Sequence, residues 1–325
     1  MRLVHTLRGI ALVLSLAAAD LAGAQAAPAL PVEAAAPVSR WQPEVERLDQ
    51  SYRDRVANAT DGRSQWIAGQ LDPGDPVAET ARYLRARSEV PAERLFLAAL
   101  ANACLEPVQP RPPACDATDR VADWATRDAD NGMPSLLLAE RARRRNNTAS
   151  MIAYLDEAAV RTRFDDYWTR GAVVLWEDIA VSTAGADPAS RAILAAGYML
   201  LRGAIGGDLW RALCHEPAGG NESVRAACYS AGTALAERGN TWALRLAGAR
   251  AAERNAATPG ETANASARVV QLQQRAQACA AQADTLAAAF ESADAAMRAR
   301  ALTAWERRLQ RQGADGEVAA CGNAG

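Results

Sequence analysis

The sequence predicts an all-α fold, in which short antiparallel α-hairpins form an array and a helical hairpin closes the chain. Two observations support this prediction. After residue 41 the chain is dominated by alanine, leucine and arginine, and no segment alternates apolar and polar residues over the length of a strand. Turn residues also interrupt these segments at short intervals, which is typical of brief connections between helices.

Turn chemistry marks where several helices begin. Asp75-Pro76 and Asp187-Pro188 each place an N-cap residue before a proline at the first helical position. Thr258 and Glu261 have the spacing of a capping box, and Gly239-Asn240 is expected to end one helix and cap the next. The expected helices cover residues 42–58, 76–88, 92–104, 116–128, 133–145, 148–160, 164–181, 188–204, 208–214, 222–238, 241–256 and 262–311, the last broken near 291–295.

The first residues predict export. A positively charged start, an apolar run over 10–19 that is too short to span a bilayer and small residues near 24 predict a cleaved signal peptide over 1–26. Because no cysteine stands there to accept a lipid, we expect a periplasmic or secreted protein without a membrane span. Residues 27–40 read as an Ala/Pro-rich linker. The predicted domains are a helical repeat-like domain over 41–257 and a C-terminal helical hairpin, packed on it, over 258–325.

Missing residue types exclude several chemistries. The chain has 36 basic residues and no lysine, so all of them are arginine, which rules out a P-loop, a Schiff-base lysine and a kinase site. A net charge of -2 argues against nucleic-acid binding. Cleavage leaves His215 as the one histidine, which excludes a multi-histidine zinc site. We therefore expect no metal site, no cofactor and no catalytic residue.

Six cysteines in an exported chain favour structural disulfides over free thiols. Fifteen pairings are formally open. Sequence order favours Cys104 with Cys115, Cys214 with Cys228 and Cys279 with Cys321. A redox or metal site is the alternative, but the sequence contains no C-x-x-C.

Residues 128–163 resemble a tetratricopeptide repeat. Residues 128–131 stand where that family has its turn between repeats, and Asn146-Asn147 occupies the tight turn within the unit, where asparagine tolerates a left-handed conformation. The small and large packing positions fall on Leu138, Ala139, Ala142, Met151, Leu155 and Ala158. A looser match extends the resemblance to residues 92–163, which makes the chain similar to irregular TPR-like or Sel1-like repeat proteins, as an exported bacterial member. A generic stack of α-hairpins is the alternative interpretation.

The resemblance implies a scaffold that binds a protein or peptide partner in a concave groove. It places Leu136, Glu140, Arg143 and Arg144 on that groove as ligand-binding residues. The family's carboxylate-clamp variant uses Lys and Asn at such places, which puts that specific ligand in doubt here. For the arginines over 141–145 the alternative is that they complement the partial negative charge of a helix C-terminus.

Two other functions stay open from the sequence. A cell-envelope hydrolase would need paired carboxylates, but Asp166 and Glu177 would lie about 16 Å apart along one helix, too far for glycoside hydrolysis. Carboxylates from different helices could still meet. A structural homodimer would use the apolar seam of the last long helix, although we expect that seam to pack within a monomer. The seam consists of Val269, Leu272, Ala276, Cys279, Ala283, Leu286 and Phe290.

Overall fold

The computed structural model describes residues 41–71, 75–105, 112–115, 119–201, 213–214, 221–290, 292 and 294–322. Within these ranges every regular element is a helix, and the only β-type pairing is two isolated bridges. The all-α fold class is therefore correct. The predicted signal peptide and linker, His215 and most of the helix predicted at 208–214 lie outside the described residues.

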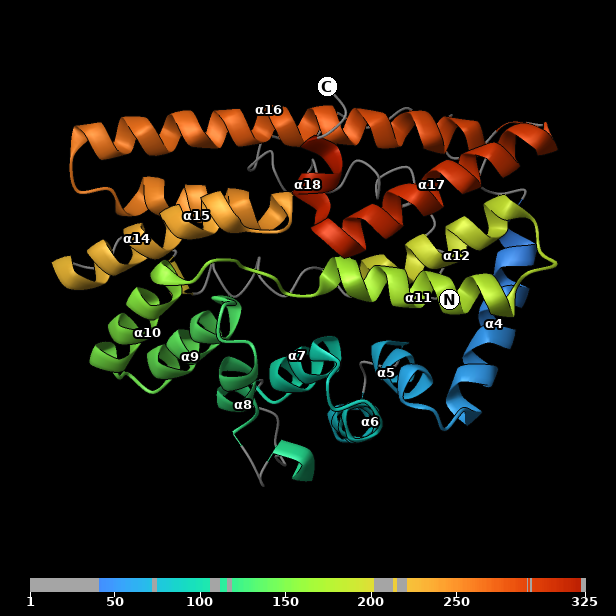
Figure 1. The fold of residues 1–325 in the computed structure, drawn as a ribbon, viewed down its shortest axis with the longest axis horizontal. Helices are drawn as coiled ribbons and strands as arrows, with labels where there is room; N and C mark the ends of the chain where they lie inside the picture. The colour runs from blue at the N-terminus through green and yellow to red at the C-terminus, as the bar shows by residue number, and fades with distance from the viewer. Residues whose placement is uncertain are drawn as a thin grey trace. The chain divides into compact units, whose positions relative to one another are not determined.

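Figure 1 labels the α-helices of the described residues. The described helices are α4 (Gln42–Asn58), α5 (Gly62–Leu71), α6 (Pro76–Glu89), α7 (Arg94–Ala103), the 3-10 helix η2 (Pro113–Cys115), α8 (Arg120–Arg127), α9 (Met133–Arg144), α10 (Thr148–Val160), α11 (Trp168–Ser182), α12 (Pro188–Leu201), α14 (Glu222–Arg238), α15 (Trp242–Asn255), α16 (Pro259–Phe290), α17 (Ala295–Asp315) and α18 (Glu317–Gly322).

The predicted capping box forms at the start of α16. Thr258 Oγ1 accepts from the Glu261 amide at 3.2 Å, and Glu261 Oε2 accepts from the Thr258 amide at 3.0 Å. Asp75 and Asp187 likewise accept amide hydrogen bonds at the starts of α6 and α12, as predicted. The left-handed conformation expected in the tight turn is found at Asn146, whose φ is 54°.

One expected helix cap was wrong, and one helix was missed. Asn240 does not cap α15, because Thr241 does so, through Oγ1 accepting from the Leu244 amide at 3.2 Å. Helix α5 was not predicted at all. Residues on all sides of this helix are buried, including the polar Ser64 and Gln65. Its sequence therefore lacks the one-sided apolar periodicity that identifies a surface helix.

The described chain divides into two compact units, each built from separate segments. One unit contains residues 60–168 and 204–272, and the other contains 1–59, 169–203 and 273–325. We call them the array unit and the mixed unit. The predicted domains were contiguous in sequence, and their boundaries stay predictions.

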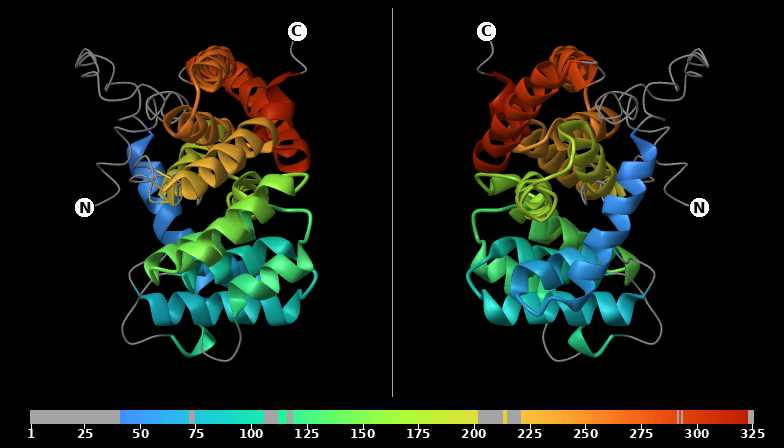
Figure 2. Two further views of the ribbon diagram at one scale, coloured as in Figure 1. Left: turned by 90° about the vertical axis from the view of Figure 1, so that its left-hand side faces the viewer. Right: turned by 90° about the vertical axis from the view of Figure 1, so that its right-hand side faces the viewer.

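In the array unit, helices that follow one another along the chain pack against each other. This path runs from α5 through α10 and continues with α14 and α15, and Figure 2 shows α9 and α10 side by side in both views. Helices α14 and α15 meet through two glycines. A Cβ on Gly248 would lie 2.6 Å from the Gly232 carbonyl oxygen, so only glycine allows this approach.

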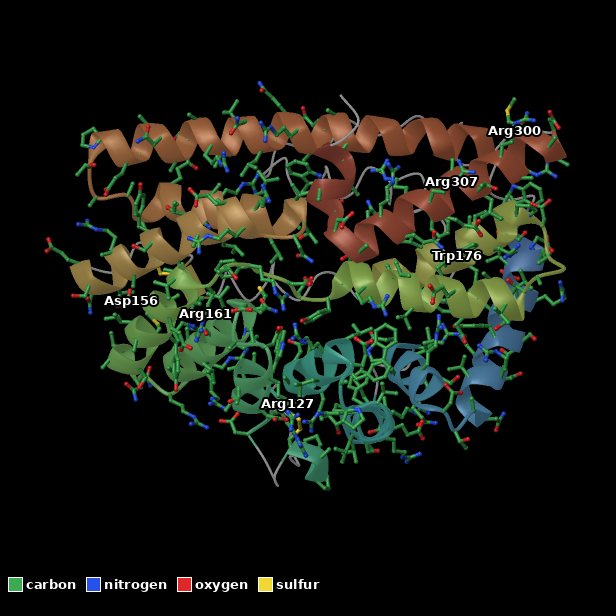
Figure 3. All side chains as sticks on the ribbon, viewed as in Figure 1. Arg127, Asp156, Arg161, Trp176, Arg300 and Arg307 are labelled. Carbon is green, nitrogen blue, oxygen red and sulfur yellow. A yellow bond between two sulfur atoms is a disulfide. The ribbon has the colours of Figure 1, made fainter. Side chains whose placement is uncertain are left out.

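The mixed unit joins helices from three distant parts of the chain. Helix α12 packs on α4 and on α17, and α17 packs on α18. Trp176 of α11 and Trp305 of α17 meet edge to face with ring centroids 4.5 Å apart, an arrangement that aromatic rings favour. Trp176 is labelled in Figure 3. Trp176 is buried and belongs to the core of this unit.

Three disulfides join the pairs that sequence order favoured. They are Cys104–Cys115, Cys214–Cys228 and Cys279–Cys321, with Cα–Cα distances of 5.4, 5.9 and 5.7 Å. The chain is thus a disulfide-stabilised helical protein. None of the helices in the described ranges combines the length and the apolar character that crossing a membrane requires.

Candidate functional site

Three loops of the array unit lie side by side and exchange backbone hydrogen bonds. We call this set the loop ladder: residues 128–132 between α8 and α9, 161–167 between α10 and α11, and 238–241 between α14 and α15. The middle loop bonds to both neighbours. The Gly132 amide donates to the Arg163 carbonyl at 2.9 Å, and the Asn240 amide donates to the Phe164 carbonyl at 3.0 Å.

Side-chain amides extend the ladder. The Asn131 side chain donates to the Asp165 carbonyl at 2.7 Å and accepts from the Asp165 amide at 3.0 Å. From the other neighbouring loop, Asn240 Nδ2 donates to the Asp165 carboxylate at 2.6 Å. Phe164 is fully buried in the ladder, and a Cβ on Gly132 would lie 2.3 Å from its ring. The loops are therefore fixed both by polar contacts and by packing.

A buried carboxylate at Asp128 gathers the polar side chains of the ladder. Its Oδ2 accepts from Trp124 Nε1 at 3.1 Å, from Asn131 Nδ2 at 2.8 Å and from the Tyr167 hydroxyl at 2.8 Å. Its Oδ1 pairs with Arg163, and with Arg94 at 3.2 Å. Because the carboxylate is 1% exposed and has these five partners, it has no open side toward a substrate.

Two acidic groups near Asp128, namely Asp165 and Tyr167, have raised pKa values. Burial raises the pKa of the Asp165 carboxyl above its usual range, and nearby hydrogen-bond donors offset only part of this effect. Burial also raises the pKa of Tyr167 to about 12, so its hydroxyl stays protonated and donates to Asp128. Tyr167 has a φ of 61°, which is rare for a bulky residue. Its amide donates to Asp165 Oδ1 at 2.8 Å, which helps to hold this conformation.

The four predicted ligand-binding residues lie on α9 and differ in exposure. Leu136 and Glu140 are buried, at 1% each, whereas the side chains of Arg143 and Arg144 are 42% and 35% exposed. Both arginines pair with the Glu140 carboxylate. Their binding role stays a prediction, and only the two arginines have side chains that reach solvent.

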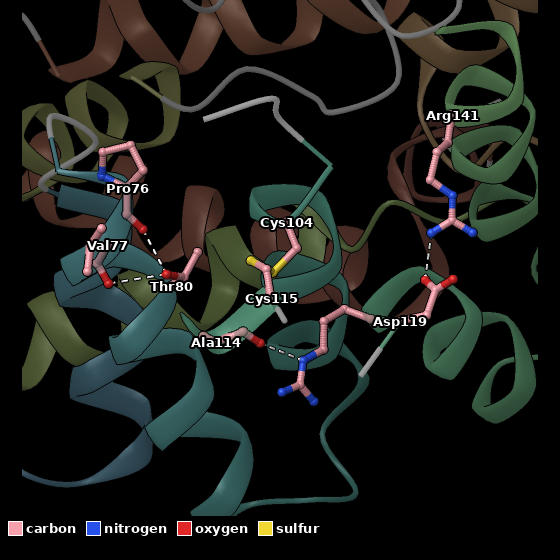
Figure 4. Close-up of a disulfide and its surroundings, with 9 residues drawn as sticks. Pro76, Val77, Thr80, Cys104, Ala114, Cys115, Asp119 and Arg141 are labelled. Atoms are coloured by element: carbon pink, nitrogen blue, oxygen red, sulfur yellow. Dashed lines mark hydrogen bonds and ion pairs between the residues drawn. A yellow bond between two sulfur atoms is a disulfide. The ribbon is translucent and has the colours of Figure 1, made fainter. Parts of the chain in front are cut away.

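The end of α9 also contacts the connection between α7 and α8. Arg141 Nη1 donates to Asp119 Oδ1 at 2.7 Å, and this contact lies near the Cys104–Cys115 disulfide (Figure 4). Arg144 Nη1 reaches the carbonyl of Leu105 at 3.5 Å. The hydrogen bond from Arg141 lowers the pKa of the Asp119 carboxyl, which keeps it ionised beside the arginines.

The mixed unit holds a second polar cluster, formed by two buried tyrosines. The Tyr52 hydroxyl donates to Asp178 Oδ2 at 2.7 Å, and the Tyr198 hydroxyl donates to Asp49. The two rings lie 5.7 Å apart. Burial raises the pKa of both hydroxyls, so they remain neutral donors. Neither tyrosine is available as an acid or base near neutral pH.

The residues considered for other functions are also placed. Asp166 is buried and accepts from the Trp168 amide at 3.0 Å, whereas Glu177 is exposed on α11. Four members of the apolar seam on α16 are buried within the chain, namely Val269, Leu272, Ala276 and Cys279; the side chains of its other three members lie outside the described residues. Within the described ranges, no three His, Cys, Asp or Glu side chains come together to hold a metal ion.

Sequence reasoning missed the partners of the ladder. Asp128 and Asn131 were noticed as turn residues, but Asp165 and Asn240 were not connected with them. The separation of 34 residues between Asn131 and Asp165 is the one sequence signal that could have linked two of the loops, because it equals the length of the repeat that residues 128–163 resemble.

Comparisons with protein-family models, with curated proteins and with solved structures find no match for the chain. The interpretation of the site therefore depends on its own geometry.

Proposed function

We propose that the chain is an exported, disulfide-stabilised helical scaffold that binds a protein or peptide partner in the cell envelope. The observation that carries this proposal is the loop ladder. It joins three connections of the array unit by backbone hydrogen bonds, so α8, α9, α10, α14 and α15 keep fixed positions in that unit. A rigid array binds with a smaller entropic cost than a flexible one, because its surface is already ordered.

The tetratricopeptide resemblance supports the same function. The six packing positions quoted for it are all buried in the α9–α10 hairpin, and the turn residues 128–131 form one strip of the ladder. Arrays of this kind stack helix pairs and expose extended surfaces to partners. The export part of the proposal has two supports, the signal-peptide pattern of residues 1–26 and the three disulfides, which persist in oxidising compartments.

The hydrogen bonding of the two ladder carboxylates favours binding over catalysis. Buried Asp128 and partly exposed Asp165 come from different loops, as the hydrolase alternative requires, but both accept hydrogen bonds from donors of the protein. A general acid or base must reach the bond that it protonates or the proton that it removes. A network that is closed in this way serves to fix the loops.

The test is a cross-linking capture from an envelope extract with the mature chain, residues 27–325, in its oxidised form. The matched control is the same chain reduced and alkylated. We expect a discrete partner that is captured by the oxidised chain only, is displaced by excess untagged protein, and binds in a defined stoichiometry once purified. Capture of nothing above the control, or of the same proteins by both forms, would contradict the scaffold function.

A further inference from the structure

We propose that Arg143 and Arg144, held by the buried carboxylate of Glu140, form a binding site for the carboxylates of an acidic peptide segment. This inference rests on the scaffold function proposed above, and it specifies the chemistry of the partner. The site lies where α9 ends, beside the connection between α7 and α8.

The geometry fixes both guanidinium groups. Arg143 donates from Nε to Glu140 Oε2 at 2.7 Å and from Nη2 to Oε1 at 2.8 Å, and Arg144 Nε donates to Oε1 at 2.8 Å. Each guanidinium has five N–H groups. Glu140 accepts only two from Arg143 and one from Arg144, which leaves further donors on side chains that are more than a third exposed.

Fixed guanidiniums bind an oxyanion better than mobile ones do. An arginine on a free side chain must lose rotamer entropy when it binds, whereas the bonds to Glu140 already restrict Arg143 and Arg144. Glu140 remains an anion under ordinary conditions. Burial alone would raise its pKa, but the hydrogen bonds from the two arginines outweigh burial and hold the pKa below its usual range.

The surroundings are positive in a chain whose net charge is -2. The end of α9 carries four arginines, Arg141, Arg143, Arg144 and Arg145. Among the described residues, the carboxylates that pair with them are those of Asp119 and Glu140. Arg145 is exposed. The excess of positive charge attracts an anionic segment, and its effect weakens as salt screens it.

A peptide fits this place better than a flat anionic membrane does. The Asp119 side chain is 43% exposed and ionised at the rim, where it pairs with Arg141. This fixed negative charge repels an extended anionic surface, whereas a narrow chain can pass beside it. The pairing with Glu140 shows the same preference, because Arg143 already binds that carboxylate through two hydrogen bonds in the forked geometry that arginine favours.

The experiment is a fluorescence-anisotropy titration of labelled octaglutamate peptide with the oxidised mature chain at low salt and pH 7. R143A/R144A should weaken binding about tenfold or more, since it removes both forks. R143K/R144K keeps the charge but not the fork, so it should also lose most of the affinity. The matched control is R300A/R307A, which removes two exposed arginines of α17 (labelled in Figure 3) and should change the affinity by less than about twofold.

Other outcomes overturn the proposal. An equal loss in the α9 and α17 variants, or full binding by R143K/R144K, means that net charge alone attracts the peptide. Absence of peptide binding together with Arg143-dependent binding to phosphatidylglycerol vesicles assigns the site to a membrane instead. If circular dichroism shows that R143A/R144A does not fold, the affinity of R143K/R144K for the peptide tests the proposal instead. An envelope partner that excess octaglutamate does not displace would leave the scaffold function standing and remove this inference.

Discussion

In the array unit the loops carry the buried polar network, whereas in the mixed unit the helices carry it. Asp128 accepts from donors of its own loop, of the 161–167 loop and of α8, and it is 1% exposed. In the mixed unit, Asp49 and Asp178 each accept a tyrosine hydroxyl from another helix, and their side chains are 17% and 14% exposed. Asp49 and Asp178 thus keep some contact with water, whereas Asp128, which accepts the most donors in the ladder, does not.

The different placement of the buried polar groups, in loops or in helices, indicates how each unit is stabilised. Asp128 accepts hydrogen bonds from side chains of two of the three ladder loops, and backbone bonds link these loops to the third, so we expect a change at Asp128 to affect several connections. The helices of the mixed unit are joined by separate contacts, such as the Trp176–Trp305 pair and the two tyrosine bonds. Because Asp49 and Asp178 are different acceptors, loss of one tyrosine bond should still leave the acceptor of the other in place.

The largest loss of folding stability is expected from Asp128→Ala. It leaves the buried donors of Trp124, Asn131 and Tyr167 without their acceptor, and breaking such a network costs about 3 to 5 kcal/mol. The measurement is urea unfolding followed by circular dichroism. Asp178→Ala in the mixed unit is the control, with an expected cost of about 1 to 2 kcal/mol. An equal loss of unfolding free energy in the two variants would mean that the array unit depends on Asp128 no more than the mixed unit depends on Asp178.

The second-largest loss of folding stability is expected from Gly248→Ala, which tests helix packing in the array unit. The added Cβ would meet the Gly232 carbonyl oxygen and the Ala236 amide nitrogen at 2.6 Å. Overpacking of this kind costs about 1 to 3 kcal/mol. The control is Gly197→Ala in α12, where a Cβ has no neighbour within 4 Å, so this variant should be neutral or more stable by up to about 1 kcal/mol. If both variants have the same thermal midpoint, the α14–α15 contact is looser than described.

A smaller, pH-dependent effect is expected from Glu140→Gln. The pKa of Glu140 is lower in the folded chain than in the unfolded chain, where it is about 4.3. Glu140 therefore contributes fully to the free energy of unfolding above the unfolded-state pKa, and this contribution is lost as the pH falls through the folded-state pKa. The variant should cost about 1 kcal/mol at pH 7, since the arginines are partly solvated, and the difference should vanish in acid. Free energies of unfolding at pH 7 and in acid check this.

Asp165→Asn should show the opposite trend with pH. The folded pKa of Asp165 is raised, so its contribution is present at low pH and is lost as the pH rises through the folded value. Relative to the native chain, this variant should therefore gain stability as the pH rises. A parallel pH dependence for both variants would contradict the assigned causes of the two shifts.

The smallest effect is expected from Tyr198→Phe in the mixed unit. It removes one hydroxyl from Asp49, which keeps its bond from Arg53 Nε at 2.9 Å. The expected cost is about 0.5 to 1 kcal/mol, measured by urea unfolding. A cost as large as that of Asp128→Ala would show that the two polar networks are equivalent after all.

The parts of the fold that could be predicted depend on local signals. The starts of α6, α12 and α16 follow from Asp75, Asp187 and the Thr258–Glu261 box, because capping involves residues that are close in sequence. Helix α5 could not be predicted in this way, since it is buried on all sides. The ladder was out of reach too, because Asn240 contacts Asp165 over 75 residues, and no local pattern encodes that distance.

For the four predicted ligand-binding residues, the sequence placed all of them on one helix but did not show how their exposure differs along it. The family resemblance placed Leu136 and Glu140 on a binding face, and both are buried. Burial depends on the neighbouring helices α8 and α10, whose positions the spacing of residues on α9 does not determine. The pairing of Arg143 and Arg144 with Glu140 is local, at three and four residues, and follows from helical spacing.

The most direct test of the account is native-state hydrogen exchange at the ladder amides. The amides of Gly132, Arg163, Phe164 and Asn240 each donate to a carbonyl of a neighbouring loop. If the ladder fixes the hairpins as one scaffold, these four amides should exchange as slowly as those inside α9 and α14, and all four should become fast together in Asp128→Ala. Exchange as rapid as in an exposed loop, already in the native chain, would contradict the claim that the array unit is a rigid binding scaffold.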